Sequence, residues 1–195
     1  MKNTKKTILI IFLSFSALII SAQKNTTNHA GLYKTEKDYK ENKLTYEFDC
    51  SSNSDFIQAS SLFKFSKVLI KVDNKRYLLL KKDFFGYKNC NNQDYRFFND
   101  KLYHILDTAG FYLYSHLESL PQDRKNNMVE KYYFSHNGSD AITALSIPLL
   151  IDSFSTNIKF HYALEHFIGK DKRLSEYDGY AKSYRIKYLY KESLK

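Results

Sequence analysis

The chain has 195 residues, of which 43% are hydrophobic and 26% are charged, and its 30 Lys and Arg outnumber its 21 Asp and Glu. This balance is typical of folded chains and excludes disorder along the whole length. Six Gly, two Pro and two Cys exclude a collagen-like repeat and a disulfide-dense scaffold. The length predicts one domain with a hydrophobic core of its own.

Residues 1–22 have the pattern of a secretory signal peptide. Three lysines precede an apolar run over residues 7–20, which is shorter than the roughly 20 residues that span a bilayer. The small residues Ser21 and Ala22 predict cleavage after Ala22, and the alternative is an uncleaved N-terminal anchor. We therefore expect an exported chain in the periplasm, at the cell surface or outside the cell. It would begin with a flexible segment over 23–30 and have no transmembrane span after cleavage.

The basic excess is smaller in the mature chain and consists mainly of lysine. Without residues 1–22 the net charge falls from +9 to +6, and only five of the 30 basic residues are Arg. Specific readers of nucleic acids use the planar fork of Arg to pair with guanine and phosphate. We therefore expect no specific nucleic-acid partner. Weak attraction of the lysines to polyanions stays open as an alternative.

The first half of the mature chain predicts one short helix followed by strands. Thr35 with Asp38 three residues later is typical of a helix N-terminus. Residues 44–48 alternate between polar and apolar side chains, as a half-buried strand does. From 62 to about 115 the period is mostly two, and turn residues such as Asp73-Asn74 separate the segments. Further predicted elements are a linker over 118–127 and a last strand over 131–134 that ends at Asn137-Gly138.

The pattern becomes helical from Ser146 onward. Ser146 and Asn157 predict the N-caps of two helices, and Gly169 predicts the end of the second. Apolar spacing predicts a third helix over 174–188, while a strand from Tyr184 to Tyr190 is the competing interpretation. The predicted fold class is α+β: an antiparallel β-meander over about 44–134 followed by C-terminal helices. A single domain over 31–195 would contain both parts.

The two cysteines, Cys50 and Cys90, form the candidate disulfide. An exported chain meets an oxidising compartment, which favours one bond between them, and two unpaired thiols are the alternative. Two cysteines without a CxxC pattern do not make a zinc site.

Several short segments, spread over most of the mature chain, resemble a family of small exported proteins of Bacteroidota that has no assigned activity. They are residues 31–35, 38–43, 84–87, 131–135 and 174–178. The resemblance implies export and a single domain, and it implies no chemistry.

The predicted helix around residue 161 has residue types that bind metals. His161 and Glu165 are four residues apart and share a helix face, whereas His166 points away from that face. The HExxH zinc pattern is absent, so we expect no metal site. The sequence also lacks the nucleophile-elbow, phosphate-loop and dinucleotide-binding patterns, and we expect no cofactor.

His136 has neighbours of the types found in a catalytic triad. Ser135, Ser139 and Asp140 are adjacent in sequence, but sequence adjacency is not triad geometry. The alternative is a turn at Asn137-Gly138 with polar caps. A hydrolase acting on cell-envelope polymers is the alternative function that these residues suggest.

Aromatic residues are the remaining compositional signal, with 17 Tyr and 15 Phe. Tyr is enriched at recognition surfaces, so exposed rings on the sheet would bind a partner protein or a surface glycan. A tyrosine-rich core is the other interpretation. The leading hypothesis is a non-catalytic envelope or secreted binding module. Its candidate binding residues are Tyr87, Tyr95, Phe97, Tyr112 and Tyr114.

Overall fold

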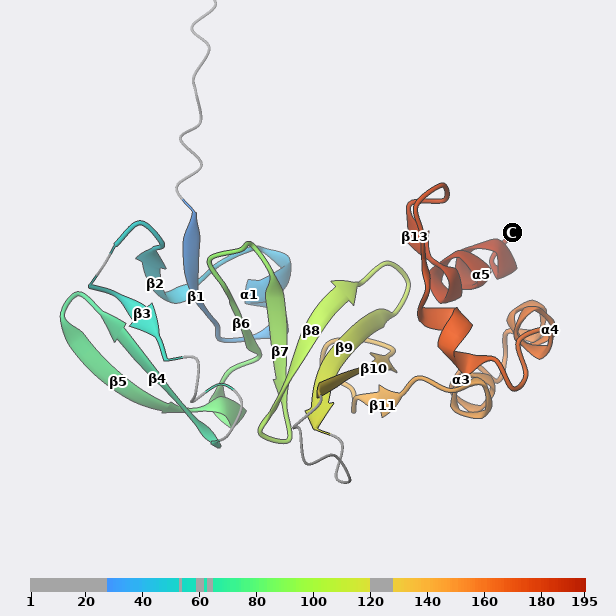
Figure 1. The fold of residues 1–195 in the computed structure, drawn as a ribbon, viewed down its shortest axis with the longest axis horizontal. Coiled ribbons are helices and arrows are strands. Elements are labelled where there is room, and N and C mark those ends of the chain that lie inside the picture. Colours follow the sequence, from blue (N-terminus) through green and yellow to red (C-terminus); the bar gives the residue numbers. More distant parts are fainter. Residues whose placement is uncertain (1–27, 53, 59–61, 63–64, 120–127) are drawn as a thin grey trace, which may run out of the picture.

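The computed structural model describes residues 28–195 except 53, 59–61, 63–64 and 120–127 (Figure 1). The predicted signal peptide over 1–22 therefore lies outside the described residues. The described chain contains an eight-stranded antiparallel sheet, a three-stranded antiparallel sheet and C-terminal helices. This architecture confirms the predicted α+β class.

The eight-stranded sheet has the order β11-β10-β9-β8-β7-β6-β1-β2. Its strands are β1 (His29–Tyr33), β2 (Thr45–Asp49), β6 (Gly86–Lys88), β7 (Asp94–Phe98), β8 (Lys101–Asp107), β9 (Tyr112–Ser119), β10 (Met128–Ser135) and β11 (Thr143–Ala144). Strands β6 to β11 follow one another as a meander, whereas β1 lies between β2 and β6. Residues 29 and 30 of the segment expected to be flexible belong to β1, and residues 23–27 of that segment lie outside the described residues. Strand β9 continues to Ser119, so the predicted linker began too early.

The second sheet consists of β3 (Phe56–Ile57), β4 (Lys67–Val72) and β5 (Lys75–Leu80). The two-residue turn between β4 and β5 consists of Asp73 and Asn74. Their φ angles are 50° and 63°, and a type I′ hairpin requires positive φ at both positions. The prediction of one continuous meander over 44–134 was wrong at this hairpin. Alternation identifies strands and turns but does not determine which strands share a sheet.

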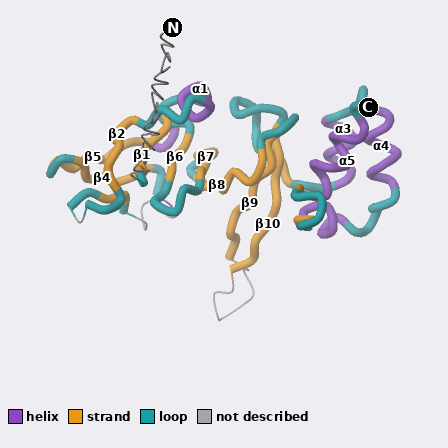
Figure 2. The backbone as a smooth tube through the Cα atoms, turned by 90° about the horizontal axis from the view of Figure 1, so that it is seen from above, coloured by secondary structure: helices purple, strands orange, loops and turns teal. Residues whose placement is uncertain are grey.

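The described helices are α1 (Glu36–Lys40), η1 (Lys81–Asp83), α3 (Ile147–Ser153), α4 (Ile158–Glu165), η2 (Asp171–Ser175) and α5 (Arg185–Ser193), where η marks 3₁₀ turns. Thr35 and Asp38 form the reciprocal capping box at α1, with Asp38 N donating to Thr35 Oγ1 at 3.1 Å. Asn157 caps α4 by accepting from Phe160 N at 3.0 Å. The predicted caps at Thr35 and Asn157 are confirmed, whereas Ser146 occupies the N-cap position of α3 without a capping hydrogen bond from its side chain. Figure 2 shows α3, α4 and α5 gathered at one end of the molecule.

The predicted third helix over 174–188 is correct only from Arg185 onward, where α5 begins, and the competing strand from Tyr184 to Tyr190 was wrong. The chain instead forms a small hairpin of β12 (Tyr177–Asp178) and β13 (Ser183–Tyr184) before α5 begins. The Asp178 carboxylate accepts from Tyr180 N and Ala181 N, at 2.8 and 3.0 Å, and so stabilises a turn where a helix was expected. The rings of Tyr177 and Tyr184 pack against each other across this hairpin, with their centres 5.1 Å apart.

Three apolar clusters fill the spaces around the eight-stranded sheet. The β3–β5 sheet covers one part of one face, where Val68 and Ile70 are fully buried as their alternation predicts. The C-terminal helices pack against Leu113 and Phe134. Helix α1 covers a third cluster, which is mainly aromatic. Its buried members are Tyr33, Phe85, Tyr103, Ile105, Tyr112 and Tyr114.

Cys50 and Cys90 form a disulfide with their Cα atoms 5.6 Å apart, which confirms the predicted pairing. Cys50 follows the edge strand β2, and Cys90 lies in the turn between β6 and β7. Because β1 lies between β2 and β6, the bond joins the edge of the sheet to its interior strands across β1.

Removing this bond should lower stability through the entropy of the unfolded chain. The bond closes a loop of 40 residues, and the loop-entropy relation gives about 4 kcal/mol for that length. We expect the Cys50→Ala, Cys90→Ala double variant to lose about that free energy of unfolding in denaturant titrations. The reduced wild-type chain is the control and should behave like the variant. Alkylation of two thiols in the unfolded chain before reduction would contradict the bond.

Candidate functional site

The structure places four of the five predicted binding aromatics in the core. Tyr87, Phe97, Tyr112 and Tyr114 have exposed fractions of 7% or less, and Tyr95 is half-buried. The expectation of exposed rings was therefore wrong for these four, and the tyrosine-rich core is what the chain forms. Layers pack over both faces of the sheet at these rings.

The two sets of rings lie on opposite faces. Tyr87 stacks on Tyr95 at 4.9 Å and lies with Phe97 beneath the β3–β5 sheet. Tyr112 and Tyr114 lie beneath α1 on the other face. These side chains therefore hold the layers together and form no open platform for a sugar ring.

The residues around His136 do not assemble a triad. Ser135 Oγ donates to the Asn137 carbonyl at 2.6 Å, Ser139 Oγ donates to Glu36 at 3.0 Å, and Asp140 accepts from the Asn137 amide at 2.8 Å. None of these groups bonds to His136, whose ring instead packs on Phe154 at 4.5 Å. Asn137 Oδ1 also accepts from the backbone amides of residues 139 and 140, so the segment is a turn with polar caps.

Three other histidines, two of them from the helix around residue 161, also contact parts of the fold. His161 Nε2 donates to the Phe154 carbonyl at 2.8 Å, and His166 Nδ1 donates to the Tyr162 carbonyl at 3.2 Å. His104 stacks on Tyr95 at 4.9 Å, and burial lowers its pKa. Within the described ranges, no three His, Cys, Asp or Glu side chains come together as metal ligands.

Glu36 is the carboxylate that connects α1 to the turn after β10. It accepts hydrogen bonds from Tyr112 Oη at 2.9 Å and from Gly138 N and Ser139 Oγ at 3.0 Å, and it pairs with Lys40 at 2.8 Å. Burial alone would raise its pKa, but these donors together lower it to about 2. A Cβ at residue 138 would lie 2.5 Å from the Glu36 Cδ, so a larger residue there would force the Glu36 carboxylate to move.

Glu36 should make stability depend on pH in the acid range. Because its folded pKa lies below the ordinary 4.5, its contribution is complete above that value and disappears as pH falls through about 2. We expect Glu36→Gln to cost on the order of 3 kcal/mol at neutral pH, and less as the solution is acidified. Denaturant titrations from pH 7 to pH 2 measure this difference.

Glu41→Gln is the matched control for this prediction. Glu41 is the C-cap of the same helix but is half exposed, and its Lys37 partner is 3.8 Å away. It should retain the acid profile of the wild type. Parallel profiles for wild type and Glu36→Gln would contradict the role of Glu36.

A cleft of about 640 Å³ lies beside β10, and we call it the β10 cleft. Its lining residues are Val129, Glu130, Lys131, Tyr132, Tyr133, Ala144, Leu145, Asp171, Lys172, Ser175 and Glu176. They come from β10, from β11 and the residue after it, and from η2 and the residue after it. Packing of η2 near this strand therefore creates the cleft.

The edge of β10 next to this cleft is only partly paired. Strand β11 pairs with Tyr133 and Phe134 alone, and Leu145 N donates to the Tyr132 carbonyl at 2.9 Å. Backbone N–H and C=O groups alternate between the two sides of a strand, so those of Glu130 and Met128 face the same way as Tyr132. No described strand pairs with these groups.

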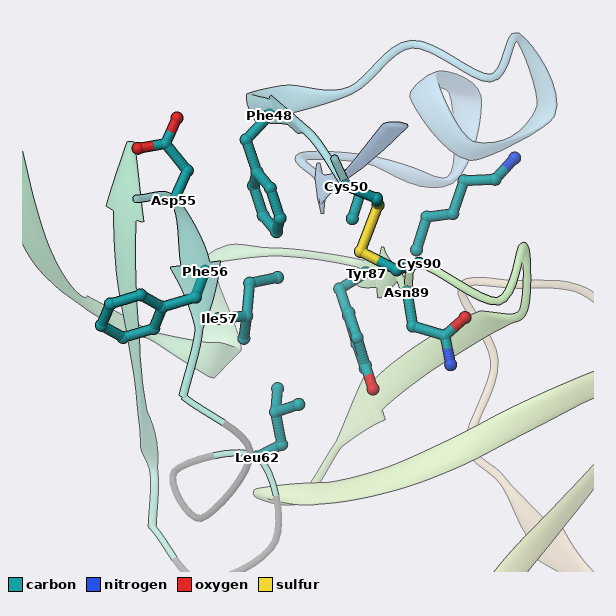
Figure 3. A pocket seen from close by; sticks show the side chains of 11 residues that line it. Phe48, Cys50, Asp55, Phe56, Ile57, Leu62, Tyr87, Asn89 and Cys90 are labelled. Atoms are coloured by element: carbon teal, nitrogen blue, oxygen red, sulfur yellow. A yellow bond between two sulfur atoms is a disulfide. The ribbon is translucent and has the colours of Figure 1, made fainter. Parts of the chain in front are cut away.

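Two further cavities are present in the described chain. One, of about 630 Å³, lies between His136 and the helices α4 and α5, and its described lining includes Lys159 but no carboxylate side chain. The other, of about 270 Å³, lies beside the disulfide between the two sheets (Figure 3). The second cavity is lined by three candidate residues from the sequence, which are Tyr87, Cys50 and Cys90.

A comparison with protein-family models finds no match, and comparisons with curated proteins and with solved structures find none either. Among the helices of the described residues, none has the length and apolar character needed to cross a membrane.

Sequence reasoning missed the β10 cleft because its walls are far apart in the chain. Residues 171–176 carry no motif that would place them beside β10. The open edge had a weak signal, since the predicted strand over 131–134 is followed by the turn at Asn137-Gly138 without a second long strand. The extra length of β10 toward Met128 appears only in the structure.

Proposed function

We propose that this chain is an exported, non-catalytic binding module that takes an extended segment of a partner protein onto the free edge of β10. The observation that carries this proposal is the unpaired edge of β10 beside a cleft of about 640 Å³. An exposed strand edge is a template for another strand, and an adjacent cleft accommodates its side chains.

The composition of the β10 cleft fits a peptide. Val129, Tyr133 and Leu145 supply apolar area, while Glu130 and Lys172 supply charges of both signs. Its volume lies within the range of ordinary ligand pockets. A partner strand would gain backbone hydrogen bonds from the edge and side-chain selectivity from the cleft.

The burial of the predicted aromatics favours a protein over a glycan as the partner. Sugar rings stack on exposed aromatic faces, and four of the five candidate rings are in the core. The nearby hairpin presents Tyr177 and Tyr180, which are exposed and could extend a protein interface beyond the cleft. The alternative of an envelope hydrolase lacks support from His136, because no carboxylate or serine is bonded to that side chain.

A proline on the edge tests the proposal. Glu130→Pro removes an N–H that faces away from β9, so the β9–β10 ladder is kept. We expect a photo-crosslinking phenylalanine analogue at Val129, in exported chains on intact cells, to capture a protein. Glu130→Pro should lower that yield at least tenfold. Proline has no backbone N–H, so a carbonyl of the added strand would lose its hydrogen-bond donor.

Two controls separate this effect from other causes. Glu130→Ala removes the same carboxylate but keeps the N–H, and should retain the crosslink. The analogue at Leu78, exposed on the β3–β5 sheet, should not capture the same protein. Equal yields with proline and alanine, or an adduct that is glycan rather than protein, would overturn the proposal.

A further inference from the structure

The cavity beside the disulfide lies where the small sheet covers the large one, and we call it the inter-sheet cavity. Its described lining residues are Ala30, Phe48, Cys50, Asp55, Phe56, Ile57, Leu62, Tyr87, Lys88, Asn89 and Cys90. They come from β1, β3 and β6, from the end of β2, and from the segments that carry Leu62 and Cys90. Phe56 is 39% exposed, so part of the rim faces solvent.

The Tyr87 side chain lines this cavity and carries a polar group, its hydroxyl. Tyr87 is 6% exposed, and its hydroxyl makes no hydrogen bond to a described residue. Buried tyrosine hydroxyls usually have partners, as do Tyr33, Tyr112 and Tyr114 in this chain. The Tyr103 hydroxyl likewise makes no hydrogen bond to a described residue, but Tyr103 lines none of the three cavities described above.

The orientation of Tyr87 makes its hydroxyl available to a bound molecule. Figure 3 shows its ring across the cavity from Ile57, with the hydroxyl end toward Leu62. Burial raises the pKa of Tyr87, so the hydroxyl keeps its proton and is a donor at neutral pH.

The charged and amide groups of the lining are engaged elsewhere. Lys88 Nζ donates to Asn42 Oδ1 at 2.9 Å, and the Asn89 amide donates to Gln93 at 2.9 Å. Asp55 accepts from Ser54 Oγ at 3.1 Å. An ionised ligand would therefore lose its hydration and would have to compete with Asn42 for Lys88 or with Ser54 for Asp55, which is costly in a mainly apolar site.

We infer that the inter-sheet cavity binds a small, uncharged, mainly apolar molecule whose single hydrogen-bond acceptor receives the Tyr87 hydroxyl. The walls from Phe48, Ile57 and Leu62 supply the apolar contact. A cavity of 150 Å³ lined by apolar side chains holds benzene, so about 270 Å³ accommodates a ligand of roughly nine non-hydrogen atoms. Aryl ketones and medium-chain carbonyl compounds have this size and chemistry. This site is separate from the β10 cleft, and the inference does not depend on the proposed function.

Three probes of equal size separate the contributions of shape, acceptor and charge. Acetophenone has the acceptor, cumene replaces the carbonyl oxygen with a methyl group, and benzoate adds a negative charge. We expect acetophenone to shift the backbone amide resonances of Ala30, Leu62 and Tyr87 in NMR titrations of the whole chain. Benzoate should bind at least tenfold more weakly than acetophenone.

Tyr87→Phe tests the hydroxyl without changing the walls. It should weaken acetophenone binding about fivefold and leave cumene binding unchanged, because only the ketone has an acceptor. Since the hydroxyl makes no hydrogen bond to a described residue, this variant should unfold at the same denaturant concentration as the wild type or a higher one. That result would exclude a folding defect as the cause of weaker binding.

Tyr114→Phe is the matched control, because it removes a buried hydroxyl that bonds to Arg96 and Ser135. It should lower the unfolding midpoint and leave the affinity for acetophenone unchanged. The inference is overturned if no probe shifts the cavity resonances, or if the shifts map elsewhere. It is also overturned if Tyr87→Phe weakens cumene and acetophenone equally.

Discussion

The buried guanidinium of Arg96 joins the central strands of this protein. Arg96 is 4% exposed and donates to Tyr114 Oη at 2.9 Å, to Ser135 Oγ at 3.3 Å and to the Asp140 carbonyl at 2.6 Å. No described carboxylate forms an ion pair with it. A buried charge is costly unless its donors are satisfied, so β7, β9, β10 and the turn after β10 must keep their relative positions. The aromatic rings of Phe85 and Phe98 complete its surroundings.

Two buried lysines follow the same principle and explain part of the basic excess. Lys81 Nζ donates to the carbonyls of Leu62 and Asp100 at 2.7 and 2.8 Å. Lys187 lies 3.8 Å from the centre of the Phe111 ring and 3.4 Å from Asp107, and burial lowers its pKa to about 8. These cations bind backbone and side chains inside the fold, so they are not part of a surface for polyanions.

Because four of the five predicted aromatic residues are packed in the core, they form no exposed recognition surface on the sheet. The small sheet and the C-terminal helices pack against one face and α1 packs against the other, and the two proposed sites lie at an edge and at a junction between layers. The β10 edge offers backbone groups to a partner strand, whereas the inter-sheet cavity offers apolar walls and the Tyr87 hydroxyl. The two proposed sites therefore use different interactions and different parts of the chain.

Local sequence was sufficient for features that depend on a few adjacent residues. The Thr35–Asp38 capping box, the Asn157 cap and the Asp73-Asn74 turn each follow from side-chain chemistry within four positions. The pairing of Cys50 with Cys90 also followed, because only two cysteines were available. Tertiary structure alone decided the insertion of β1 between β2 and β6, the separation of the β3–β5 sheet and the burial of four candidate rings. Each of these depends on which distant segments cover a strand, and a periodic pattern records that a face is apolar without recording what lies against it.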